Sequence, residues 1–137
     1  MKMKSLNCSG NKILFITGYG GRYGSGHFIR SRRFAAGSGE CAVLLLLKPG
    51  KKPEYYSDFQ AANWDQACKM AAEYSPSAVV FDCREIPSGI VKKIRSFSAV
   101  IIIDSRGGET VLGDIIVSSL MLPCANLLSN FTGLPYL

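Results

Sequence analysis

The chain has 137 residues, the length of one ordinary domain, and its 47% apolar and 19% charged residues suffice for a hydrophobic core, which excludes a disordered chain. The formal charge of +6 favours an anionic partner. The basic residues are scattered and no aromatic residues lie among them. Nucleic acid therefore ranks last among the candidate partners, below a small anionic molecule.

The sequence also argues against a membrane span, a signal peptide and a metal centre. No apolar run approaches the roughly 18 residues of a membrane helix, and residues 1–7 lack the apolar stretch of a signal peptide. Five cysteines without a C-x-x-C pair predict reduced, mostly buried thiols in a cytoplasmic protein. With a single histidine and no thiol pair, neither a zinc site nor another cofactor is expected.

Residues 1–11 are expected to form an N-terminal extension, and residues 12–137 a single domain. The domain begins with a predicted strand over residues 12–17, whose continuous apolar side chains are typical of a strand covered on both faces. A glycine-rich loop follows. A helix is then predicted over residues 27–36, with Gly37-Ser38-Gly39 as its C-cap.

The next part of the chain contains a second strand and a second helix. The strand is predicted over residues 41–47 and ends at a solvated turn over residues 48–53. Residues 54–59 are ambiguous, since two tyrosines favour a strand while a Ser-Asp pair favours a turn or a cap. Residues 63–74 have apolar side chains at helical spacing and predict the helix.

Two further strands each lead into an aspartate. Residues 78–81 predict a strand with Asp82 at its carboxyl end, and residues 99–103 predict a strand that is followed by Asp104. A short helix over residues 89–95 is predicted between them.

A last short strand is predicted over residues 114–117, after a loop over residues 106–109. Buried strands thus alternate with helical segments, which predicts an α/β domain with a parallel sheet, right-handed crossovers and helices on both faces. Ligands of such sheets bind beyond the carboxyl ends of the strands. The glycine-rich loop, Asp82 and Asp104 all fall at these ends, so a ligand site is expected there.

The loop and the helix that follows the first strand are the parts of a βα phosphate-binding turn. Glycines let backbone N–H groups approach a ligand, although the spacing fits neither a Rossmann fingerprint nor a P-loop. His27 opens the helix, where the positive end of the dipole favours the neutral ring that a general base needs. His27 is therefore the catalytic candidate. The ligand-binding candidates are Gly20, Gly21, Gly24, Ser25, Gly26, Arg30, Asp82 and Asp104.

Each of these residues also has a structural interpretation. The loop can be a plain connection, and His27 can hydrogen-bond to backbone at the helix end. Asp82 and Asp104 can cap the turns that follow them, and Arg30 can brace the loop against either carboxylate. Trp64 is assigned to the core rather than to a stacking surface.

A family resemblance rests on two motifs. Gly24-x-Gly26-His27-x-x-Arg30, placed after the first strand, resembles the N-terminal domain of the UDP-sugar hydrolase of pseudaminic acid synthesis and its relatives in spore-coat polysaccharide synthesis. Residues 101–108 and 112–117 resemble that family's pattern of a strand, an acidic turn and an aspartate-apolar-apolar strand. These proteins belong with the GT-B glycosyltransferases, which include the transferase that adds N-acetylglucosamine in peptidoglycan synthesis.

The resemblance implies a Rossmann-like domain, a UDP-sugar as ligand and chemistry at the anomeric carbon that needs no metal. It implies that His27 is the base that activates water or an acceptor hydroxyl, with the glycine loop facing the diphosphate and the sugar. The family often has a tyrosine two residues after the aspartate of its fourth strand, where this chain has Arg84. GT-B enzymes have two Rossmann-like halves and this chain resembles the first, so a second half or a homodimer is an expected partner.

Two interpretations of the function remain open at this point. The first is the sugar-side or acceptor-side half of a nucleotide-sugar hydrolase or glycosyltransferase. The second is a non-catalytic half-domain that binds a nucleotide-sugar or phosphate, or that docks onto a second subunit. The chain itself is expected to be a fragment of a longer enzyme, one subunit of a split enzyme or a stand-alone half.

Overall fold

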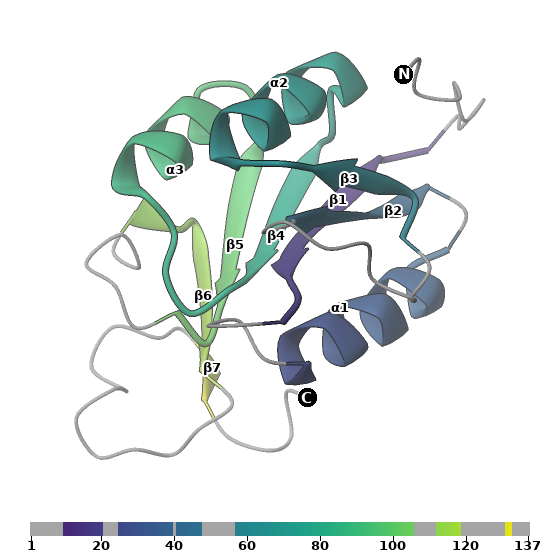
Figure 1. Cartoon of the computed structure of the whole chain (residues 1–137). Helices are drawn as coiled ribbons and strands as arrows, with labels where there is room; N and C mark the ends of the chain where they lie inside the picture. Colours follow the sequence, from purple (N-terminus) through teal and green to yellow (C-terminus); the bar gives the residue numbers. More distant parts are fainter. Residues whose placement is uncertain are drawn as a thin grey trace.

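The computed structural model describes residues 10–20, 25–39, 41–47, 57–105, 112–118 and 131–132. In these residues the apolar runs of the sequence form one parallel sheet, with strand order β3-β2-β1-β4-β5-β6-β7 (Figure 1). The strands are β1 (Ile13–Gly18), β2 (Ala42–Leu47), β3 (Phe59–Ala61), β4 (Ala78–Asp82), β5 (Ala99–Ile103), β6 (Ile115–Ser118) and β7 (Phe131–Thr132).

The chain enters the sheet at its centre. From β1 it moves outward through β2 to β3, then returns to the other side of β1 with β4 and moves outward again through β5, β6 and β7. The strand order therefore reverses between β1 and β4. Ligand sites of open α/β sheets lie at the carboxyl ends of the strands beside such a switch point.

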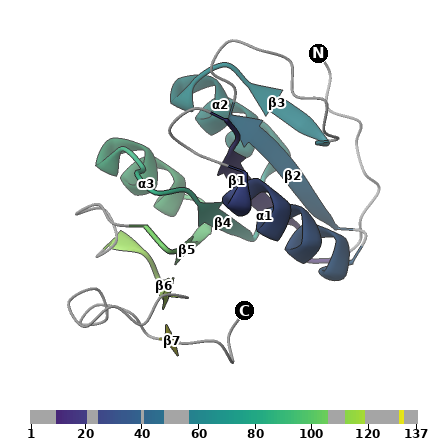
Figure 2. The same cartoon turned by 60° about the horizontal axis from the view of Figure 1, so that its bottom comes forward.

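Helices cover both faces of this sheet. α1 (Gly26–Gly37) lies on one face, and α2 (Trp64–Tyr74) and α3 (Ser88–Arg95) lie on the other, as Figure 2 shows from a second direction. In β1, Leu14 and Ile16 pack under α2 and α3, while Phe15 packs under α1. Because both faces are buried, successive strand residues are apolar. The predicted α/β class is confirmed, and the arrangement is Rossmann-like.

The predicted elements agree with the structure to within a residue or two at most of their ends. β6 begins at Ile115 rather than at Asp114, because the Asp114 carboxylate turns back and accepts a hydrogen bond from the N–H of Val100 (2.8 Å). The helix end predicted at Gly37-Ser38-Gly39 is confirmed, with Ser38 as the C-cap of α1 and Gly39 after it at a φ of +88°, which glycine readily adopts. α2 is capped by Asn63, which accepts a hydrogen bond from the N–H of Gln66 (2.9 Å).

Two short strands were not predicted. β3 overlaps the ambiguous segment 54–59 by one buried residue, Phe59, and β7 has only two residues. Strands this short contain too few residues to show a period in the sequence. The predicted loops over residues 48–53 and 106–109 lie outside the described residues.

The cysteines agree only in part with the prediction of reduced, buried thiols. Cys68 and Cys83 are free and buried, and burial together with the neighbouring Asp82 charge raises the pKa of the Cys83 thiol. Cys41 is disulfide-bonded, so the prediction is wrong for this residue. Spacing along the sequence does not show which thiols the fold brings into contact. Of the helices described, none has the length and apolar character needed to cross a membrane.

The buried face of α1 can be tested with two adjacent residues. Phe28 is 1% exposed and packs edge-on against Tyr19 with ring centroids 5.5 Å apart, whereas Ile29 is 47% exposed. We expect Phe28→Ala to lower the free energy of unfolding by about 3–5 kcal/mol and Ile29→Ala to change it by less than about 0.5 kcal/mol, both measured by urea denaturation. Similar losses for the two variants would contradict this placement of the helix.

Candidate functional site

The carboxyl ends of β1, β4 and β5 meet the start of α1 at the switch point of the sheet. Asp82 is the last residue of β4 and pairs in register with Thr17 of β1. Asp104 follows β5 directly. The α1 side chains that meet these carboxylates are His27, Arg30 and Ser31. Four residues predicted from the sequence (His27, Arg30, Asp82 and Asp104) thus form one cluster.

The centre of this cluster is the Asp82 carboxylate, which is fully buried. Its Oδ1 accepts hydrogen bonds from Nδ1 of His27 (2.6 Å) and Nη2 of Arg30 (2.5 Å). Its Oδ2 accepts hydrogen bonds from Nε of Arg30 (2.9 Å) and Oγ of Ser31 (3.0 Å). Four donors from α1 therefore surround one buried anion, which is the condition for placing a charge inside a protein.

The ionised state of Asp82 follows from these donors. Burial on its own would raise the pKa of the carboxyl group, but the hydrogen bonds from Arg30 and His27, together with the positive charge of Arg30, outweigh burial and hold the pKa below its ordinary value. Burial likewise opposes the charge on Arg30, yet its bonds to Asp82 and Asp104 raise the pKa of the guanidinium. The buried pair is therefore an ion pair at every physiological pH.

Arg30 also joins the ends of two neighbouring strands. While two of its nitrogens bind Asp82, Nη1 donates to Oδ2 of Asp104 (2.5 Å). Asp104 has a φ of 52°, in the left-handed region that aspartate tolerates better than most residues. The contact of Arg30 with a carboxylate that the sequence suggested is thus present, and it involves both carboxylates. Residues 21–24 of the loop that Arg30 was expected to brace lie outside the described residues.

The hydrogen bond to Asp82 defines the proton position on His27. An ionised carboxylate can only accept, so Nδ1 carries the proton and donates it. In the neutral ring, Nε2 is then an unprotonated acceptor on the opposite side of the imidazole. The side chain is 15% exposed, and within the described ranges no partner for Nε2 is found. A histidine held by a buried carboxylate in this way is suited to act as a general base.

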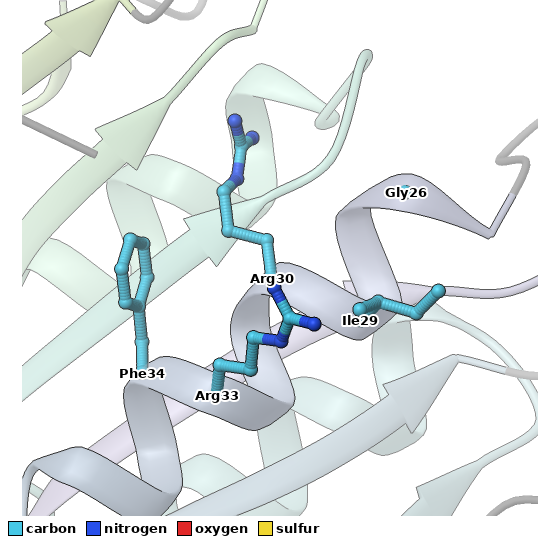
Figure 3. A pocket seen from close by; sticks show the side chains of 5 residues that line it. All are labelled: Gly26, Ile29, Arg30, Arg33 and Phe34. Carbon is cyan, nitrogen blue, oxygen red and sulfur yellow. The ribbon is translucent and has the colours of Figure 1, made fainter. Parts of the chain in front are cut away.

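A cavity of about 530 Å³ adjoins the cluster along α1 (Figure 3). Its lining residues are Gly26, Ile29, Arg30, Arg33 and Phe34. The volume lies within the usual range for small-molecule sites. Arg33 is exposed and makes no ion pair with any acidic side chain in the part of the chain that the structure describes. The cavity therefore combines apolar surface with a positive charge that a ligand can use.

The remaining predicted residues lie at the entrance to α1 or outside the described part. Ser25 is the N-cap but makes no side-chain capping bond. The space where a Cβ of Gly26 would lie is open, and Gly20 has a φ of +74°, as expected for a loop glycine. Gly21 and Gly24 are outside the described residues. The first turn of α1 is thus accessible beside His27.

Two members of the cluster are absent from the sequence-based set. Ser31 is the third side chain that donates to the Asp82 carboxylate, and Thr17 donates from its hydroxyl to the Asp82 backbone carbonyl (3.0 Å). Ser31 comes four residues after His27, which places both side chains on one side of the helix. This spacing could have predicted that Ser31 belongs to the cluster. Thr17 could have been identified as a polar residue at the end of an apolar run.

Comparisons of the chain with protein-family models, with curated proteins and with solved structures found no match. Within the residues described, no group of three or more His, Cys, Asp or Glu side chains could hold a metal ion. The interpretation of the site therefore depends on its own geometry and on the motif around His27.

The buried charge of Asp82 makes stability depend on pH in a defined direction. The pKa of Asp82 is lower in the folded chain than its ordinary value of 3.8, so its stabilising contribution is complete above that pH and is lost as pH falls through the folded value. We expect Asp82→Asn to be less stable than wild type by about 3–5 kcal/mol near neutral pH. The difference should narrow as pH falls below 3.8, as measured by urea denaturation at several pH values.

Asp114→Asn is the matched control for this experiment. Asp114 pairs with Arg95 at 2.9 Å while both side chains are substantially exposed, and asparagine keeps an oxygen that can accept from the N–H of Val100. We expect it to change the free energy of unfolding by less than about 1 kcal/mol. Parallel pH profiles for wild type and Asp82→Asn would contradict the buried ion pair.

Proposed function

We propose that this domain is the sugar-side or acceptor-side half of a nucleotide-sugar hydrolase or glycosyltransferase, with His27 as its general base. The observation that carries the proposal is the hydrogen bond from His27 to the buried Asp82 carboxylate at the switch point of the sheet. The pair leaves Nε2 as the basic nitrogen at the edge where ligands of this fold bind.

In the proposed reaction, Nε2 of His27 takes a proton from water or from an acceptor hydroxyl. The oxygen then forms a bond to the anomeric carbon, and the bond between that carbon and the diphosphate oxygen breaks. The nucleoside diphosphate leaves with the electron pair. The imidazolium that forms is stabilised by Asp82, as in other carboxylate–histidine pairs.

The start of α1 supports a diphosphate beside the base. The first turn of a helix has backbone N–H groups without intrahelical partners, and its dipole favours an anion. The space at Gly26 is open, so a phosphate can approach this turn without meeting a side chain. Arg33 in the adjoining cavity adds a positive charge. The choice of a UDP-sugar among anionic ligands rests on the resemblance of the motif Gly24-x-Gly26-His27-x-x-Arg30.

A second function is favoured by one observation. The guanidinium of Arg30 forms ion pairs with Asp82 and Asp104. A cluster of this kind can stabilise a domain that binds a nucleotide-sugar, or that docks onto a partner, without catalysing a reaction. This alternative predicts binding of the nucleotide-sugar with no release of UDP.

The base is tested by UDP release from a panel of UDP-N-acetylhexosamines, with the full chain as enzyme. We expect His27→Gln to lower kcat by about 10²–10⁴-fold, the usual contribution of a general base, while ligand binding and the folded structure persist. Turnover by His27→Gln at the wild-type rate would remove His27 from the mechanism. Binding by wild type with no UDP release would favour the non-catalytic alternative.

The cavity is tested by two neighbouring arginines on α1. Both Arg32 and Arg33 are exposed, but only Arg33 lines the cavity. We expect Arg33→Gln to weaken binding of a UDP-N-acetylhexosamine by about tenfold or more and Arg32→Gln to change it little, as measured by calorimetric titration. Both variants remove one positive charge, so equal effects would indicate general electrostatic attraction instead of a contact in the cavity.

A further inference from the structure

The Arg30 guanidinium lies where two carboxylates and the imidazole meet. It donates to both oxygens of Asp82 and to Asp104, and its Nη2 is 3.4 Å from Nδ1 of His27. Because Nδ1 uses its proton to bind Asp82, it has no lone pair for Arg30 in this tautomer. The contact of 3.4 Å is therefore a cation placed beside the ring.

The charges around the ring act in opposite directions. In the described residues, the charged groups near His27 are Asp82 from β4, Arg30 from α1 and, beyond Arg30, Asp104 from β5. A carboxylate 2.6 Å from Nδ1 favours a second proton on the ring, since an opposite charge stabilises imidazolium. The Arg30 cation disfavours that proton, because like charges repel. Without Arg30, the ring would face the Asp82 carboxylate with no cation beside it among the described residues.

We propose that Arg30 is a positioning residue that keeps His27 neutral and protonated on Nδ1. It does so by fixing Asp82 with two hydrogen bonds and by offsetting the carboxylate charge beside the ring. Asp104 binds the third nitrogen of Arg30, and its negative charge partly offsets the repulsion between the Arg30 cation and a protonated ring. The consequence for catalysis rests on the proposed function, since a neutral ring matters because a base must be unprotonated before it acts.

Asp104 provides a variant that changes charge with little change in shape. Its φ of 52° is in the left-handed region, where asparagine is also well tolerated. Its backbone N–H binds the carbonyl of Val117 (2.9 Å), and this bond does not involve the side chain. Asp104→Asn therefore removes one negative charge behind Arg30 while the backbone of the turn can persist.

The test is nitrogen NMR of the imidazole in the full chain at a fixed pH near neutrality. The chain has one histidine, so the ring signals belong to His27 without further assignment. In wild type we expect a protonated Nδ1 and an unprotonated Nε2. Arg30→Gln should raise the ratio of imidazolium to neutral ring by about tenfold or more. Asp104→Asn should lower this ratio, and Arg30→Lys, which keeps the charge, should stay near wild type.

An unchanged or lower ratio in Arg30→Gln would overturn the proposal, and so would a proton on Nε2 in wild type. If Arg30→Gln fails to fold, the Asp104→Asn variant is the test. A lower ratio of imidazolium to neutral ring in this variant supports the proposal, and an unchanged or higher ratio overturns it. No substrate is needed, so absence of UDP release would count against the proposed function alone. Where UDP is released, the kcat of Arg30→Gln should recover at higher pH, which loss of structure alone would not produce.

Discussion

The buried carboxylate of Asp82 determines how the first helix sits on the sheet. A charge without water is stable only when donors replace the lost hydration. Here the donors are three side chains within little more than one turn of α1, namely His27, Arg30 and Ser31. A rotation or shift of α1 would leave the anion unpaired. The apolar contacts of Phe28 fix the distance between helix and sheet, whereas the ionic contacts fix the helix's rotation and its position along its axis.

Because this constraint lies at the switch point, fold and site depend on the same few residues. β1 and β4 are neighbours because the chain, after β3, returns to the other side of β1. This return places the end of β4 beside the start of α1, although Asp82 and His27 are 55 positions apart in the sequence. A ligand at this edge would therefore contact side chains whose orientation is fixed by hydrogen bonds to Asp82.

The sequence could predict the location of the site better than its internal contacts. Continuous apolar strands predict a parallel sheet, and the carboxyl ends of parallel strands share an edge, so His27, Asp82 and Asp104 could be expected together. Which donor binds which carboxylate oxygen depends on the rotation of α1 about its axis. The spacing of residues in the sequence predicts this rotation only to within about one residue. Ser31 was missed for this reason. β3 was missed because it is too short to show a period. The Cys41 disulfide was missed because the pairing of thiols by the fold leaves no local signal in the sequence.

The residue after Asp82 has a separate consequence. Cys83 is wholly enclosed, its thiol contacts the Ile16 carbonyl at 3.6 Å, and the neighbouring anion helps to keep it protonated. Reagents that attack thiolates can reach it only when β4 separates from its neighbours. Cys83 is thus a built-in reporter of how often the sheet opens next to the site, and saturation of the pocket by a ligand would be visible as slower labelling of this one sulfur.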